Sequence, residues 1–155
     1  QTIKNDFMPD LGYEIVDFQY DTWQIRNWTN LKEMIAGPEF EAGGWKWRIL
    51  LFPYGNYNSN VVSIYLEIDD PKGAPVGWHC CAQFALALWN PEDRTSYVGK
   101  SGHHRFTAEE PYSGVTRFCE QNKLFVPSDN RLRPLIENDT CNITAFVRII
   151  KDPTG

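Results

Sequence analysis

The sequence predicts an all-β fold, an antiparallel β-sandwich of about seven or eight strands. The first observation is a series of short apolar segments in which every second residue is apolar, a period typical of strands. The second is the ten Pro and eleven Gly that lie between these segments and favour many turns. The third is a high aromatic content, with six Trp, seven Tyr and nine Phe, which can fill one core.

We divide the 155 residues into a flank, one domain and a short linker. Residues 1–16 have no clear period and are expected to be a loosely held N-terminal flank. The alternating pattern spans residues 17–151, a length that can bury the core of one domain. Residues 152–155 break the pattern and are expected to begin a linker.

The segment from Trp78 to Asn90 is predicted to be a central strand. It is a long, nearly uncharged run between a Pro- and Gly-rich turn at residues 71–77 and the Asn90-Pro91 turn. Its large apolar residues alternate with Gln and Ala, which favours a strand covered on both faces.

Three elements are expected at the N-terminal end of the domain. A first strand runs from residue 17 to residue 27, and its pattern changes phase near Thr22, which suggests a bulge. Residues 31–36 are expected to form one helical turn. The Gly43-Gly44 turn then leads into a strictly alternating strand at residues 45–53.

Further strands are expected on both sides of the central strand. Residues 62–68 form a strand whose outer face includes Tyr65, which leaves that ring available for contact. Residues 92–102 are expected to be turn-like, and the acidic loop 109–111 interrupts a region with buried Phe106, Val115 and Phe118. The last strand covers residues 141–149.

Charge and hydropathy exclude several classes of partner. The net charge is −5, and no local run of Lys and Arg exceeds two or three residues, so we expect neither nucleic acid nor an anionic membrane surface as a partner. No apolar run approaches the roughly 20 residues needed to span a bilayer. The first ten residues do not resemble a signal peptide. We expect a soluble, monomeric domain.

The cysteines predict a reducing compartment. None of them forms a Cys-x-x-Cys pair, and neighbouring strand residues point to opposite faces, so we expect free thiols in a cytoplasmic or nuclear protein. Three Asn-x-Ser/Thr triplets point the other way, because a secreted chain would be glycosylated there. The cysteines are Cys80, Cys81, Cys119 and Cys141, and the triplets begin at Asn27, Asn138 and Asn142.

Neither a catalytic centre nor a metal site is predicted, and no cofactor is expected. A nucleophilic enzyme needs a Cys or Ser beside a His. The only candidates are His79-Cys80-Cys81 and His103-His104, whose neighbouring side chains face apart on a strand. The same residues lack the spacing of zinc ligands. A glycine-rich phosphate loop is also absent from the sequence.

Four blocks in order resemble the MATH (meprin and TRAF homology, TRAF-like) domain. They are TWQIRNWTNL from Thr22, GGWKWRILLFPYGN from Gly43, VVSIYLEIDD from Val61, and HRF followed by GVTRF between His104 and Phe118. Within the family, WHCCAQFALALWN resembles the herpesvirus-associated ubiquitin-specific protease group. The segments HRFTAEE and RIIKDPTG are similar to its fungal members.

The resemblance implies a protein-interaction module rather than an enzyme. Such a module recruits substrates or a targeting partner to a deubiquitinating cysteine protease, and residues 152–155 would lead toward its catalytic domain. Ubiquitinated substrates would then be reached through the full-length protease. One alternative is the substrate adaptor of a ubiquitin ligase. Another, from a different class, is a secreted carbohydrate-binding sandwich that uses surface aromatic residues.

Family members bind an extended peptide as an added strand in a shallow groove. Carried over by position, the resemblance implies binding by Tyr54, Tyr65, Phe84, His104, Tyr112, Ser113, Gly114 and Val115. The family has Asp-Trp-Gly-Phe where this chain has residues 112–115, so only the glycine and its expected backbone turn are kept. Tyr54 stands where the protease group commonly has a basic residue.

Two hypotheses follow from these departures. In the first, the groove still binds peptides with a more apolar selectivity, and Tyr54, Tyr65 and Tyr112 serve as contact platforms. In the second, the groove has lost this role, and another face of the sandwich contacts a folded partner.

Overall fold

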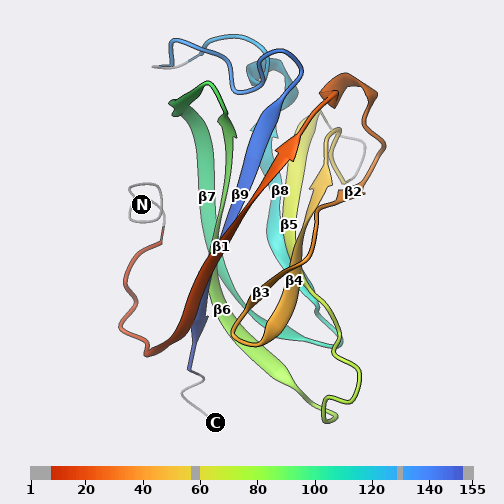
Figure 1. Ribbon diagram of the computed structural model, residues 1–155, viewed down its shortest axis with the longest axis vertical. Coiled ribbons are helices and arrows are strands. Elements are labelled where there is room, and N and C mark those ends of the chain that lie inside the picture. The colour runs from red at the N-terminus through yellow and green to blue at the C-terminus, as the bar shows by residue number, and fades with distance from the viewer. Residues whose placement is uncertain (1–7, 57–59, 129–130, 152–155) are drawn as a thin grey trace.

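The described residues of the computed structural model, 8–56, 60–128 and 131–151, form two antiparallel sheets packed face to face (Figure 1). The first sheet has the order β1 (Ile15–Ile25), β9 (Cys141–Ile150), β6 (His79–Asn90) and β7 (Asp93–Thr107). The second has the order β2 (Ile35–Ala36), β4 (Trp45–Phe52), β5 (Val61–Ile68) and β8 (Tyr112–Glu120), with β3 (Phe40–Ala42) beside β4. The predicted antiparallel sandwich is confirmed. The described residues form nine strands rather than the expected seven or eight, and two of the nine, β2 and β3, are very short.

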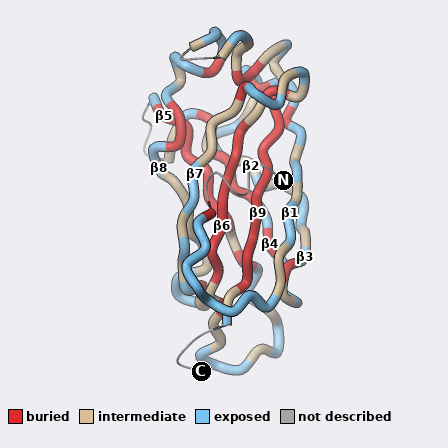
Figure 2. Tube along the Cα trace, turned by 90° about the vertical axis from the view of Figure 1, so that its left-hand side faces the viewer, coloured by how far each residue is buried: buried red, intermediate tan, exposed pale blue. Residues whose placement is uncertain are grey.

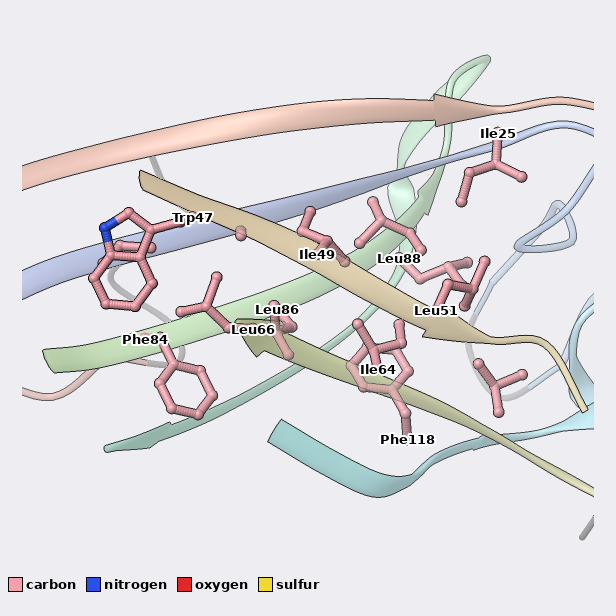
Figure 3. Close-up of a cluster of buried hydrophobic side chains, with 14 of the residues drawn as sticks. Ile25, Trp47, Ile49, Leu51, Ile64, Leu66, Phe84, Leu86, Leu88 and Phe118 are labelled. Carbon is pink, nitrogen blue, oxygen red and sulfur yellow. The ribbon is translucent and has the colours of Figure 1, made fainter. Parts of the chain in front are cut away.

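The core lies between the two sheets and consists of their inward-facing alternate residues. Trp47, Ile49 and Leu51 on β4 face Phe84, Leu86 and Leu88 on β6, and all six are at most 2% exposed (Figure 3). The ring of Trp47 meets the edge of Phe106 at a centroid distance of 4.9 Å, and its indole Nε1 donates to the Ala42 carbonyl at 3.0 Å. A buried indole therefore keeps its hydrogen bond inside an apolar core.

Strand β6 is the predicted central strand, and both of its faces are covered. On one side it pairs with β9 and on the other with β7 over nearly its whole length. Its inner face joins the core, while Ala85 on the outer face packs with Met8 and Phe146. This second apolar cluster explains why the strand carries almost no charge.

The described part of the N-terminal flank is docked on the sheet, which corrects the expectation of a loosely held segment. Met8 is 3% exposed against the outer face of β6 and β9. The carbonyl of Pro9 accepts hydrogen bonds from Gln83 Nε2 at 2.7 Å and from Arg148 Nη1 at 3.1 Å. The flank thus adds an acceptor to two buried polar side chains, which also contact each other through Arg148 Nη1 and Gln83 Oε1 at 2.8 Å.

The bulge expected near Thr22 is wrong. Strand β1 pairs with β9 in continuous register from Asp17 to Ile25, and the irregularity lies between Ile15 and Asp17. The change of phase has another cause. Phe18 stacks on Phe146 across the outer face, at a centroid distance of 6.4 Å, so the first half of the strand carries its large rings outward.

Two further expectations are corrected. Residues 31–36 form no helical turn, because Ile35–Ala36 pairs with β4 and the short 3-10 turn η1 lies earlier, at Trp28–Asn30. Residues 92–102 are largely extended, since β7 spans Asp93–Thr107. Its pairing with β6 supplies an order that its polar, Gly-containing sequence does not indicate.

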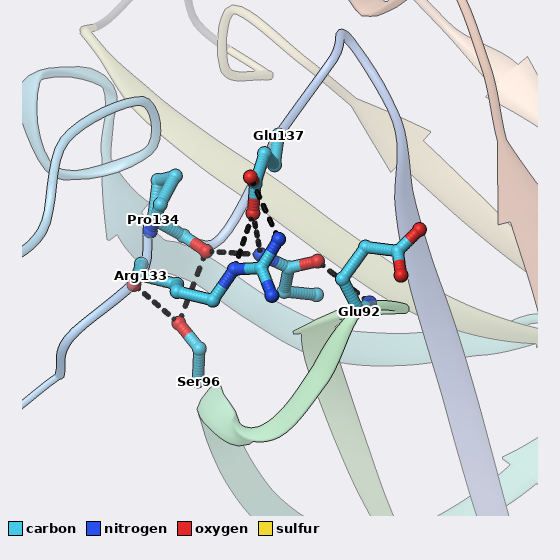
Figure 4. Close-up of polar contacts among 6 residues, drawn as sticks. Glu92, Ser96, Arg133, Pro134 and Glu137 are labelled. Atoms are coloured by element: carbon cyan, nitrogen blue, oxygen red, sulfur yellow. Dashed lines mark hydrogen bonds and ion pairs between the residues drawn. The ribbon is translucent and has the colours of Figure 1, made fainter.

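The connection between the second 3-10 turn, η2 (Gln121–Lys123), and β9 is clamped to the end of the first sheet (Figure 4). Asn90 Nδ2 donates to the Pro134 carbonyl at 2.9 Å and to Glu137 Oε1 at 2.8 Å. The Arg133 guanidinium binds both carboxylate oxygens of Glu137, each at 2.8 Å. Ser96 Oγ donates to the Arg133 carbonyl at 2.7 Å. Residues 133–137 are therefore held to the end of the first sheet although they form no helix or strand.

Candidate functional site

The site predicted from the resemblance maps to the side of the sandwich where β7 and β8 form the edges of opposite sheets. Within the described residues, β7 pairs only with β6, and β8 pairs only with β5. Figure 2 shows β7 and β8 side by side along this margin, on the left of the view. We call this margin the open side.

Two contacts define how β7 and β8 lie against each other. The amide of Thr107 donates to the Glu110 carbonyl at 3.2 Å where one strand turns into the next. Farther along, Lys100 Nζ donates to the Arg117 carbonyl at 3.4 Å. Both contacts fit one antiparallel alignment, in which His104 lies opposite Ser113.

His104, Ser113 and Val115 are brought together on the open side. Ser113 pairs with Leu66 and Val115 with Ile64, so both side chains share the inward face of β8 with core residues. All three residues are half-buried. The His104 ring packs edge-on against Phe106 at 4.7 Å, and its Nε2 lies 3.1 Å from the Glu110 carbonyl oxygen. They form a shallow, mixed polar and apolar margin.

The backbone of β8 offers hydrogen-bonding groups to the open side. The amide of Ile68 donates to the Pro111 carbonyl at 2.8 Å, which fixes the phase of the β5–β8 ladder. Because antiparallel pairing alternates, the N–H and C=O groups of Ser113 and Val115 face β5. Those of Tyr112 and Gly114 face away from β5. An added strand could pair with these two residues.

Gly114 lies in mid-strand rather than in the expected backbone turn. A Cβ at this position would lie 2.3 Å from the Ile64 carbonyl oxygen and 2.5 Å from Tyr65 Cα. Gly114 is also absent from the glycines with positive φ among the described residues. The glycine is needed because the backbone of Ile64 and Tyr65, and then the Tyr65 ring, approach it too closely for a side chain.

Tyr65 is buried, which corrects the expectation that it is available for contact. It is 6% exposed, because Phe52 and Tyr112 flank its ring edge-on at 5.6 and 5.7 Å. Its hydroxyl lies 2.9 Å from Thr116 Oγ1. Of this row of rings, Tyr112 is the exposed end, with 51% of its surface accessible. The platform is therefore Tyr112 supported by Tyr65.

A bulge in β8 follows the candidate groove. Ser63 alone stands opposite residues 116–118, because the register shifts between Val62 and Ile64. Ser63 Oγ donates to the Thr116 carbonyl at 2.6 Å and accepts from the backbone N–H of Asn56 at 3.2 Å. This network holds the bulge, and the sequence pattern did not indicate it. The alternating sequence pattern of β4 does place Phe52 on the outer face. The sequence could therefore have predicted Phe52 as the ring that packs against Tyr65.

The remaining predicted residues lie apart from this cluster. Phe84 is 2% exposed and packs inside the core against Phe106, with Gly102 above its ring. It supports the open side from beneath and does not reach the surface. Tyr54 is 42% exposed just after β4, and its preceding carbonyl, that of Pro53, accepts a hydrogen bond from Gln121 Nε2.

Three of the four cysteine thiols are buried. Burial raises the pKa of Cys80 to about 12, and burial also raises the pKa values of Cys119 and Cys141. Such thiols stay protonated at neutral pH and are poor nucleophiles. None of the four cysteines is in a disulfide, and within the described ranges no three His, Cys, Asp or Glu residues are grouped to hold a metal ion.

Fold and site together describe a small β-sandwich with a free strand edge suited to binding. The sequence matches the family described as MATH domain over residues 20–147, and the chain belongs to that family. The solved structure of TRAF5 from Notothenia coriiceps supports the fold, with a TM-score of 0.60 at 13% identity, over 86% of this chain and 74% of that one.

Within the family, the chain is similar to part of the ubiquitin carboxyl-terminal hydrolases of fungi. It is 40% identical to ubiquitin carboxyl-terminal hydrolase 15 of Saccharomyces cerevisiae and 36% identical to ubiquitin carboxyl-terminal hydrolase 5 of Schizosaccharomyces pombe. Each match covers 96% of this chain but only 13% of the relative. The expected resemblance to the MATH domain of this protease group is therefore confirmed. Neither helix in the described ranges has the length or apolar character to cross a bilayer.

Proposed function

We propose that this domain recruits protein partners to a ubiquitin-specific protease by binding an extended peptide along β8. The observation that carries the proposal is the free edge of β8, where the backbone groups of Tyr112 and Gly114 face away from β5. A peptide paired with these groups gains affinity from the backbone and selectivity from the side chains beside it.

The surroundings of this edge suit an extended segment with alternating contacts. A peptide side chain on one face would meet Tyr112, which is backed by the buried Tyr65. A side chain on the other face would meet Ser113, Val115 and His104. Tyr112, backed by Tyr65, stands where the family has its Asp, and Ser113 stands where it has its Trp, so we expect a preference for an apolar peptide residue beside Tyr112.

A folded partner at another face remains the second candidate, because the acidic and indole groups of the family loop are missing. The exposed Tyr20 on β1, packed against Phe146, would belong to such a surface. A ubiquitin-ligase adaptor would use the same open side as the protease domain. Full-length sequencing of the gene separates these two roles, since only the protease carries a catalytic domain.

The secreted carbohydrate-binding alternative receives less support. Asn142 lies inside β9 between β1 and β6 and is 8% exposed, so a glycan there would displace neighbouring strands. Four free thiols also suit a reducing compartment, and we place the domain in the cytoplasm or nucleus. Thiol titration of the denatured, unreduced protein should give four reactive cysteines, whereas two disulfides would support secretion.

Peptide display against the 155-residue chain tests the proposal. We expect an enriched extended motif whose affinity falls about tenfold, or about 1.4 kcal/mol, in Tyr112→Ala, because the exposed ring is the contact platform. The matched control is Tyr20→Ala, which removes an exposed tyrosine from the opposite sheet and should change affinity less than about twofold. Equal affinities for both variants, or no enrichment by a folded sample, would favour the folded-partner candidate.

A further inference from the structure

A depression of about 400 Å³ lies on the open side beyond the candidate groove. Strand β7 contributes to one wall, the end of β8 and η2 to the other, and the clamped connection reaches it through Arg131. Among the described residues, its lining includes four cationic side chains and one acidic side chain. The lining residues are Val61, Val98, Lys100, Arg117, Phe118, Cys119, Glu120, Lys123 and Arg131.

Three of these cations are not neutralised by carboxylates. Lys100, Arg117 and Lys123 are exposed, and within the described ranges none of them forms an ion pair. Two basic residues elsewhere are paired, since Arg48 lies 2.6 Å from Glu67 and Arg133 lies 2.8 Å from Glu137. The depression is thus a concentrated positive site on a chain of net charge −5.

Three of the cations in the lining lie close enough to the Cys119 thiol to affect its pKa. Burial raises the pKa of Cys119 in the lining, the charges of Arg131, Lys123 and Lys100 each oppose that rise, and the charge of Glu120 adds to it. A thiol responds to three cations only if they lie near it. An anion at the mouth of the depression would feel the same combined attraction.

The walls of the depression are held in place. Leu124, directly after Lys123, is fully buried, and its carbonyl accepts from the Ile136 amide at 2.9 Å. Arg131 Nη2 donates to Ser128 Oγ at 2.5 Å. The clamp of Asn90, Arg133 and Glu137 fixes the connection that follows. The backbone near these cations is therefore held in place before an anion binds.

We propose that this depression is a subsite for the carboxylate or phosphate groups of an acidic segment in a protein partner. The proposal rests on the peptide-binding role of β8, because Arg117 follows Gly114 by three residues on that strand and lies in the bulge at residues 116–118. A segment paired with Gly114 would therefore carry its acidic groups into the depression. The acidic end would also set the direction in which the partner lies on β8.

A protein segment fits the site better than nucleic acid. Polynucleotide binding draws on many phosphate contacts along a basic stripe. This site offers one compact group of cations on an acidic domain. The exposed Arg117 in the group can bind a carboxylate or phosphate through paired N–H donors, which favours discrete anionic side chains.

The test uses three fluorescent hexapeptides and measures binding to the 155-residue chain by anisotropy. One is GEEGEE, one is its uncharged counterpart GQQGQQ, and one carries two phosphoserines for a similar charge. We expect GEEGEE or the phosphopeptide to bind about tenfold more tightly than GQQGQQ, with affinity that falls as salt is raised. The tighter of the two anionic peptides identifies carboxylate or phosphate as the natural group.

The variant Lys100→Glu/Arg117→Glu should weaken binding of the anionic peptide about tenfold, because it reverses two charges of the depression. The matched control Arg94→Glu/Arg105→Glu makes the same charge change on exposed residues of β7 outside the lining and should cost less than about twofold. Equal losses in both double variants, or equal binding of GQQGQQ, would overturn the proposal. Tighter binding of a thymidine oligonucleotide at the depression would overturn the assignment to a protein segment.

These outcomes are separable from those of the proposed function. The hexapeptides contain no selected motif, so Tyr112→Ala should leave their binding unchanged. Binding at the depression without any enriched display motif would contradict peptide binding along β8 but support the anionic subsite. An enriched peptide whose affinity is unchanged by Lys100→Glu/Arg117→Glu and by removal of its own acidic residues would contradict the subsite alone.

Discussion

Gly114 shows how one residue can link packing to binding. The absence of a side chain lets the Tyr65 ring cross β8, and Tyr65 in turn supports Tyr112. The same residue directs its backbone groups toward the open side. Both roles depend on close approach of the two strands rather than on a turn, since Gly114 continues the β5–β8 ladder.

Gly114→Ala is expected to destabilise the domain by about 1–3 kcal/mol, because the added methyl group overlaps the backbone of Ile64 and Tyr65. Urea denaturation measures this change. Ser113→Ala, one position earlier, removes a hydroxyl that forms no side-chain hydrogen bond in the described ranges and should cost under about 0.5 kcal/mol. Similar losses for both variants would show that β8 can shift to admit a side chain.

At the scale of elements, the N-terminal segment belongs to the folded domain. Met8 fills the outer face of β6 and β9, and Pro9 supplies an acceptor for the buried Arg148 and Gln83. Strand β6 is apolar on both faces partly for this reason. The segment and β6 therefore depend on each other.

We expect Met8→Ala to lower the free energy of unfolding by about 2 kcal/mol, the lower end for a buried methionine, because a terminal segment can adjust. Chemical denaturation provides the measurement. Met34→Ala is the matched control, since Met34 is 46% exposed and should cost less than about 0.5 kcal/mol. If Met8→Ala proved as mild as its control, the docking of the flank would contribute no stability.

The clamp on the connection predicts a pH dependence. Hydrogen bonds from Arg133 and then Asn90 lower the pKa of Glu137 below its ordinary value. A carboxyl whose folded pKa is depressed stabilises the fold above its unfolded pKa and loses that contribution as the pH falls through the folded pKa. The stability difference between the native chain and Glu137→Gln should therefore be largest at neutral pH and shrink in acid.

Urea midpoints measured from neutral to acidic pH test this dependence. Glu41→Gln is a suitable control, because Glu41 is exposed on β3 and forms no ion pair in the described part of the chain. Its difference from the native chain should stay small throughout. A Glu137→Gln difference that does not change with pH would contradict the role of the clamp.

For the whole molecule, local pattern predicted the strands that bury one complete face. Strands β4, β5, β6 and β9 were expected almost at their observed bounds, because alternation of apolar residues is a local signal. Strand β7 was missed because its order comes from pairing with β6. The docked flank was missed for the same reason, since nothing in residues 8–14 alone indicates the surface that receives them.

The candidate site could be predicted only in part. The resemblance gave residues 112–115, but the burial of Tyr65 depends on rings from β4 and β8 that only the fold assembles. The basic depression was missed altogether. Its four cations lie between residues 100 and 131 without forming a local cluster, so composition and charge runs indicated no positive site.

The central claim is that a partner peptide adds a strand to β8, and amide hydrogen exchange tests it most directly. In the free domain, the amides of Ser113 and Val115 should exchange slowly, because they face β5, while those of Tyr112 and Gly114 should exchange faster. Adding a display-selected peptide should slow the Tyr112 and Gly114 amides by about tenfold or more. A peptide that binds while both of these amides exchange as before would contradict strand addition.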